Sequence, residues 1–142
     1  MVEVVNRQRR RAVDGERWGR FAADALKKIG VGDAPGATVV FVSDRTMRGL
    51  NRRFRGRGYA ADVLSFPAQQ TEFEKLSGAY LGDVVISVER AAAQATEHGL
   101  EYDEEVAQLI LHGLLHLCGY DHETDAGEMN RLELRLRRRL GI

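Results

Sequence analysis

The sequence has very little cysteine or proline and no long hydrophobic run, and each shortage excludes a class of protein. Its single cysteine, Cys118, cannot form an internal disulfide, which fits a reducing compartment. No apolar run approaches the roughly 20 residues of a membrane span. The basic residues near the N-terminus are not followed by the apolar segment of a signal peptide. We therefore expect a cytoplasmic protein with no membrane partner.

Net charge is also lacking, although the charges are strongly segregated. The chain has 21 basic and 21 acidic residues, which argues against a uniformly basic nucleic-acid binder. Of the basic residues, 18 are arginine, whose planar fork suits phosphate better than the point charge of lysine. For the arginines near both termini, a compositional preference for arginine is as good an explanation as phosphate binding. A central stretch free of acids is the stronger candidate for a phosphate-binding surface, and it contains Arg45, Arg48, Arg52, Arg53, Arg55 and Arg57.

The length of 142 residues and the patterning of apolar residues predict one domain, spanning residues 1–142. β-branched and aromatic runs indicate strands near 1–5, 38–42, 62–66 and 81–88. Helical spacing indicates helices near 14–29, 44–55, 89–98, 103–117 and 125–140. We expect an α+β fold in which about four strands form a small sheet packed with four to five helices. The strand order does not follow from these patterns, and the polar segment 69–79 is expected to be a loop.

Three of the four histidines lie within eleven residues. His112 and His116 are separated by four positions on the most apolar predicted helix, so both imidazoles lie on one face and can share one ion. Gly119 suits the left-handed conformation that ends a helix, after which the chain can turn to bring His122 to the same ion. Three neutral imidazoles suit zinc and leave a fourth position open, as in catalytic sites. A zinc site is therefore predicted at the C-terminal end of this helix.

The histidine spacing matches that of the metzincin peptidases, but one residue departs from their pattern. Those enzymes carry a glutamate general base directly after the first histidine. Here that position is Gly113. The spacing thus favours zinc and disfavours ordinary peptide hydrolysis, unless a carboxylate such as Asp83 or Asp121 supplies the base.

Neighbouring residues admit two interpretations each. We interpret Cys118 as a core residue rather than a fourth ligand. Asp121 either accepts a hydrogen bond that orients a zinc-binding imidazole or is a turn residue, and for Asp125 we favour a helix cap. His98 stands apart in the sequence and is interpreted as a surface residue.

The segment HGLLHLCGYDH, residues 112–122, resembles the signature H-G-x-L-H-L-x-G-Y-D-H of the YbeY family. Two further segments carry the resemblance. LNRRFR (50–55) followed by DVLSFP (62–67) is similar to the family's L-N-x-x-[YF]-R and P-T-[DN]-V-L-S-F-P, and LGDVVI (81–86) resembles its L-G-D-[IV]-x-I strand. One departure is the family's Pro-Thr, which is Ala60-Ala61 here.

The resemblance implies a zinc-dependent endoribonuclease specific for single strands, which acts in ribosomal RNA maturation at the 3′ end of 16S rRNA and in ribosome quality control. It implies zinc ligands at His112, His116 and His122 and a functionally important arginine at Arg55. RNA is the expected partner, together with the ribosome or proteins of its small subunit. Arg45, Arg48, Arg52, Arg53 and Arg57 are expected to contact RNA. One Zn²⁺ per chain is expected, although other divalent transition metals also accept imidazole.

Two other functions remain open from the sequence. The first is a zinc hydrolase of peptides or small amides, which the ligand spacing motivates. The second is a non-catalytic ribosome assembly factor in which zinc only stabilises the fold.

Overall fold

The computed structural model describes residues 2–31, 35–56, 61–68, 80–121 and 123–142. Its strands are β1 (Val2–Asn6), β2 (Ala37–Val42), β3 (Val63–Pro67) and β4 (Gly82–Ser87), and its helices are α1 (Gly15–Ile29), α2 (Asp44–Arg55), α4 (Val88–His98), α5 (Tyr102–Leu117) and α6 (Glu128–Leu140). These elements confirm the predicted α+β fold. None of the helices in these segments is long and apolar enough to cross a bilayer. The predicted loop at 69–79 lies outside the described residues.

The four strands form one mixed sheet in the order β1-β2-β4-β3. β1, β2 and β4 are mutually parallel, whereas β3 runs antiparallel to β4 at the edge. The sequence could not predict this order, because β3 precedes β4 in the chain yet lies beyond it in the sheet. The arrangement matters for function, since it makes the strand of the DVLSFP segment an edge strand.

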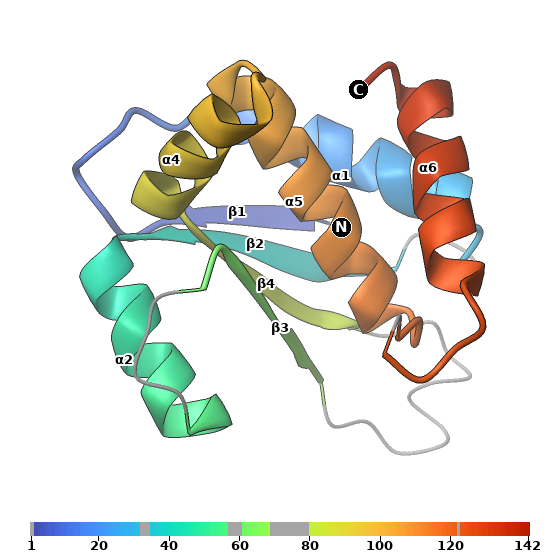
Figure 1. Ribbon diagram of the computed structural model, residues 1–142, viewed down its shortest axis with the longest axis horizontal. Helices are drawn as coiled ribbons and strands as arrows, with labels where there is room; N and C mark the ends of the chain where they lie inside the picture. Colours follow the sequence, from blue (N-terminus) through green and yellow to red (C-terminus); the bar gives the residue numbers. More distant parts are fainter. Residues whose placement is uncertain (1, 32–34, 57–60, 69–79, 122) are drawn as a thin grey trace.

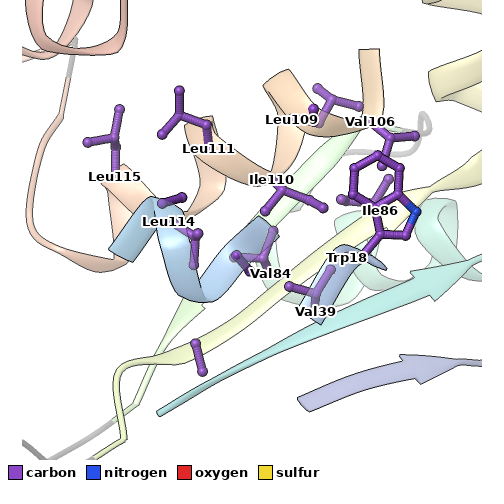
Figure 2. Close-up of a cluster of buried hydrophobic side chains, with 14 of the residues drawn as sticks. Trp18, Val39, Val84, Ile86, Val106, Leu109, Ile110, Leu111, Leu114 and Leu115 are labelled. Carbon is purple, nitrogen blue, oxygen red and sulfur yellow. The ribbon is translucent and has the colours of Figure 1, made fainter. Parts of the chain in front are cut away.

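The main core lies between the sheet and the helices α1 and α5, with α6 packed against both helices (Figure 1). Alternate residues of β2 and β4, including Val39, Val84 and Ile86, point from the sheet into this core. Figure 2 shows them meeting Trp18 of α1 and a run of apolar side chains of α5. Burial of this apolar surface is the main force that fixes α5 in place.

A smaller cluster covers the opposite face of the sheet, where α2 packs (Figure 1). It consists of Val42, Met47, Leu64 and Val85, with Leu50 and Phe66 partly buried against it. Because α2 buries only this narrow apolar stripe, most of its remaining side chains face solvent. The exposed ones include Arg45, Arg48, Arg52, Arg53 and Arg55.

The helix ends largely follow the predicted caps. Asp14 caps α1 by accepting from the Arg17 amide, and Ser43 rather than Asp44 caps α2. The prediction was wrong for the last helix, which begins at Glu128 and not at Asp125. The Asp125 carboxylate does accept hydrogen bonds from backbone amides at the start of this helix, but a left-handed residue intervenes before the first helical turn.

The closest approach between α5 and the sheet occurs at Gly113. A Cβ atom built on this glycine would lie 2.5 Å from Cγ1 of Val84 in β4. The Ser65 hydroxyl of β3 donates to the Gly113 carbonyl oxygen at 3.0 Å. Gly113 therefore lies on the side of α5 that faces the sheet, and the helix can lie this close only because the position has no side chain.

We expect Gly113→Ala to destabilise the protein by about 1–3 kcal/mol, because overpacking outweighs the higher helix propensity of alanine. The free energy of unfolding in urea measures the effect. Gly49→Ala in α2 is the matched control, since nothing lies within 4 Å of an added Cβ there. The control should be neutral or stabilised by up to about 1 kcal/mol. Equal behaviour of the two variants would contradict the packing argument.

Candidate active site

Two imidazoles converge on one face of α5. His112 and His116 are both partly buried, and their ring centroids are 4.8 Å apart at an interplanar angle of 77°. Their Nε2 atoms face each other at 3.2 Å. The prediction that these two side chains share a face of one helix is confirmed by this geometry.

The separation of the Nε2 atoms fits a shared metal ion. Two imidazole nitrogens bound to one tetrahedral zinc at 2.0–2.1 Å would lie about 3.3 Å apart. The observed 3.2 Å is close to that value. Among the described residues, no set of three His, Cys, Asp or Glu side chains is placed to hold a metal. The third expected ligand, His122, lies outside those residues.

The chain reverses direction immediately after α5. The amide of Gly119 donates to the His116 carbonyl and the amide of Tyr120 to the Leu115 carbonyl, the two hydrogen bonds of a Schellman motif. Gly119 has φ of 97°, a conformation that costs glycine little. The reversal returns Tyr120 and Asp121 to the side of α5 that carries the histidines. A turn at Gly119 is what the sequence predicted.

A buried carboxylate from another helix contacts the first histidine. Oε1 of Glu133, in α6, lies 2.8 Å from Nδ1 of His112, and its Oε2 accepts from Arg137 at 2.7 Å. Burial alone raises the pKa of Glu133, but the hydrogen bond and charge of His112, together with Arg137, lower it overall. The carboxylate is therefore ionised near neutral pH and accepts from both partners.

The two histidines form one wall of a pocket of about 350 Å³. The edge strand β3 and the end of α2 also contribute to its lining. The lining residues are Arg55, Asp62, Val63, Ser65, Pro67, His112, His116, Gly119, Tyr120 and Asp121. The pocket thus combines imidazole, guanidinium and carboxylate groups from two stretches of the chain, 55–67 and 112–121, that are distant in sequence.

Arg55 is the one member of the arginine stretch that lines this pocket among the described residues. It is the last residue of α2, directly before the left-handed Gly56 that ends the helix. Arg45, Arg48, Arg52 and Arg53 are exposed along α2. Arg57 lies outside the described residues. The helix therefore forms an arginine-rich surface that leads toward the pocket at Arg55.

Other residues singled out from the sequence occupy simpler positions. Asp121 lines the pocket, and its carboxylate accepts from the Glu123 amide within the turn. Asp83 lies outside the pocket lining and accepts from the Tyr80 hydroxyl. His98 is exposed, as predicted for a surface residue, and its Nδ1 lies 2.7 Å from the buried carboxylate of Glu105. Ala61 packs against the small cluster under α2, and Ala60 lies outside the described residues.

Sequence reasoning missed Glu133 and Asp62. Glu133 is four residues after Met129 and three before Leu136, both buried. An acid on the apolar face of an amphipathic helix was the available signal, because a buried glutamate normally requires a partner. Asp62 was considered only as the start of a strand. Its position in the pocket depends on β3 being at the sheet edge, which no local pattern reveals.

The position that holds the catalytic glutamate in metzincins has no room for one. Gly113 faces Val84 and the sheet, and it is not among the residues that line the pocket. A general base at that position would therefore need a different approach of α5 to the sheet. This packing argues physically against the peptidase interpretation.

Cys118 is expected to be an unreactive thiol. It is partly buried against the main core, and burial raises its pKa from 9.0 to about 11. The shift lowers the thiolate fraction near neutral pH about a hundredfold, and the thiolate is the reactive species. We expect the metal-free native protein to react with a thiol reagent at pH 7.5 about a hundredfold more slowly than the urea-unfolded chain. Rates that agree within a few fold would contradict this prediction.

Comparisons with known proteins identify the family of this chain. A family model described as Endoribonuclease YbeY matches residues 3–141. The endoribonuclease YbeY of Solibacter usitatus is 46% identical over 87% of this chain and 77% of its own length. That of Koribacter versatilis is 41% identical over 98% of this chain and 86% of its own length.

A likeness in structure extends over the whole fold. The solution structure of TM1509 from Thermotoga maritima matches 99% of this chain and 89% of its own, with a TM-score of 0.61. At 22% identity this likeness bears on the fold alone. The family match and the close relatives confirm the resemblance drawn from the sequence motifs: the chain belongs to the endoribonuclease YbeY family.

Proposed function

We propose that this chain is a metal-dependent endoribonuclease that cleaves single-stranded regions of ribosomal RNA in the cytoplasm. Its family membership supports the endoribonuclease activity. The observation that carries the rest is the pocket that two converging imidazoles line together with Arg55. Metal, phosphate and nucleophile can all be accommodated in such a space.

In this proposal His112 and His116 hold Zn²⁺ together with His122. Nitrogen ligands of this kind suit zinc, and three of them leave an open coordination position. When bound, such an ion supplies Lewis acidity toward a phosphoryl oxygen. Nickel or another divalent ion that accepts imidazole is chemically compatible with the same ligands.

The role proposed for Arg55 is to bind the phosphate at the cleavage site. Its guanidinium can donate two parallel hydrogen bonds to phosphate oxygens and can stabilise the negative charge that develops during cleavage. The two carboxylates that line the pocket, Asp62 and Asp121, are the candidates for taking a proton from the attacking hydroxyl. Both face the same space as the histidines.

The size of the pocket favours a flexible strand. A volume of about 350 Å³ is at the small end of ligand pockets, so it admits one nucleotide unit more readily than the stacked pairs of a duplex. The exposed arginines of α2 are proposed to track the RNA backbone on the way to the pocket. Binding through this surface should weaken steeply with salt, because each phosphate contact releases counterions. Ribosomal RNA within the small subunit, with its proteins, is the proposed setting.

Substitution of Arg55 tests the proposed phosphate contact. We expect Arg55→Ala to lower kcat for a single-stranded oligoribonucleotide by about 100-fold or more, as when one oxyanion donor is removed. Zinc content should stay at the wild-type level. Arg20→Ala on α1 removes an equal charge from a side chain that is 74% exposed and outside the pocket, so it serves as the control. Similar losses in both variants would show a general charge effect instead.

Removal of a histidine tests the proposed metal site. We expect one zinc per wild-type chain, and a substantially lower zinc content together with loss of RNA cleavage in His116→Ala. His98→Gln is the matched control, because it alters a histidine outside the pocket while retaining a donor for Glu105. Elemental analysis and an RNA cleavage assay on the same preparations measure both effects.

The possible contrary outcomes separate the alternatives. If the zinc-loaded wild type and His116→Ala both left RNA intact, the proposal of a nuclease would be overturned. If the zinc-loaded wild type instead cleaved a peptide library in a zinc-dependent way, a hydrolase of peptides or small amides would become the favoured function. If metal removal unfolded the chain and no substrate were cleaved, the assembly factor would be favoured.

A further inference from the structure

The structure assigns Glu133 a role as a positioning residue: it fixes the tautomer and ring orientation of His112, and Arg137 fixes the carboxylate in turn. The inference rests on the proposed metal site and adds a residue from α6 to it. The three side chains form one continuous chain of hydrogen bonds that ends at the histidine pair.

The first step concerns the proton on His112. An ionised carboxylate can only accept hydrogen bonds, so the 2.8 Å contact from Nδ1 to Oε1 of Glu133 requires the hydrogen on Nδ1. In the neutral imidazole Nε2 then carries a lone pair. This is the atom that lies 3.2 Å from Nε2 of His116. Glu133 therefore selects the tautomer of His112 that is able to bind a metal at the pocket.

The second step concerns the carboxylate. Glu133 lies on the buried face of α6, and the residue is only 8% exposed. The guanidinium of Arg137, one helical turn later, binds its other oxygen at 2.7 Å. With one oxygen held by each partner, the carboxylate plane cannot rotate without breaking a hydrogen bond. The orientation of the His112 ring is thereby tied to α6 as well as to α5.

A purely structural role explains this burial less well. An apolar residue would stabilise the interface between α5 and α6 at least as well as a buried ion pair, because desolvation of the charges offsets their attraction. A carboxylate on the far nitrogen of a metal-binding histidine, by contrast, has a specific effect on ring orientation and ligand basicity. The cost of burying Glu133 is therefore matched by a function at His112.

Two variants of Glu133 test the inference. Glu133→Met keeps the length of the side chain but removes the acceptor, and Glu133→Gln keeps an acceptor oxygen without the charge. Glu97→Gln, at an exposed position of α4, is the matched control for loss of a negative charge on a helix. Circular dichroism and urea unfolding of each metal-free protein establish that it is folded.

The first measurement is the tautomer of His112 in metal-free protein, from ¹⁵N NMR at a pH where the ¹⁵N shifts themselves show a neutral ring. We expect the Nδ1–H form in the wild type and in the glutamine variant, and loss of this preference in Glu133→Met. A structural ion pair alone would not move this signal. A wild-type His112 protonated on Nε2 would overturn the inference without any variant and without any metal.

The second measurement is the affinity for Zn²⁺ in competition with a chelator. We expect Glu133→Met to bind zinc about 10–100-fold more weakly than the wild type, as for other partners of metal-binding histidines. Glu133→Gln should lie between the two, and Glu97→Gln should match the wild type. If Glu133→Met does not fold, the glutamine variant decides the test.

The outcomes distinguish this inference from the proposed function. Zinc affinity equal to the wild type in the folded Glu133 variants, or an unchanged tautomer in folded Glu133→Met, would overturn the positioning role while the metal site stands. Absence of zinc binding by the wild type would instead remove the metal site from the proposed function. The tautomer measurement would still test Glu133 in that case.

Discussion

The contact between α5 and the sheet at Gly113 is the constraint on which the site depends. Because this residue has no side chain, the helix rests directly on Val84 of β4 and receives a hydrogen bond from Ser65 of β3. The residues before and three after it, His112 and His116, are then held at the rim of the sheet, facing the pocket. An added methyl group would push the helix, and with it both imidazoles, away from the edge strand.

The edge strand and the two faces of the sheet explain how the pocket acquires its chemistry. β3 presents Val63 and Ser65 to the pocket, whereas Leu64 belongs to the small cluster under α2. This alternation lets one strand form the pocket wall and anchor α2 on the opposite face. Arg55 reaches the pocket because α2 ends there. A pocket lined by guanidinium, carboxylate and imidazole groups thus arises where a helix end meets a sheet edge.

The last helix contributes more than packing. Met129 and Leu136 bury α6 against the core, and between them Glu133 reaches His112. A C-terminal element is thereby linked to the histidines through a charged side chain rather than through apolar contacts alone. Such a link constrains the orientation of the His112 ring as well as its distance from α6, since hydrogen bonds to a carboxylate require defined geometry.

The sequence by itself determined the elements, most of the caps and the histidine pair, because these depend on local spacing. Helical periodicity places His112 and His116 on one face regardless of what surrounds them, and Gly119 marks the reversal because few other residues adopt its conformation. The family resemblance singled out Arg55 as well. Only the tertiary structure decided the strand order, the pocket that joins Arg55 and Asp62 to the histidines, and the contact from Glu133. Those features depend on pairing and packing between segments far apart in the chain, and no local pattern of residues encodes which segments will meet.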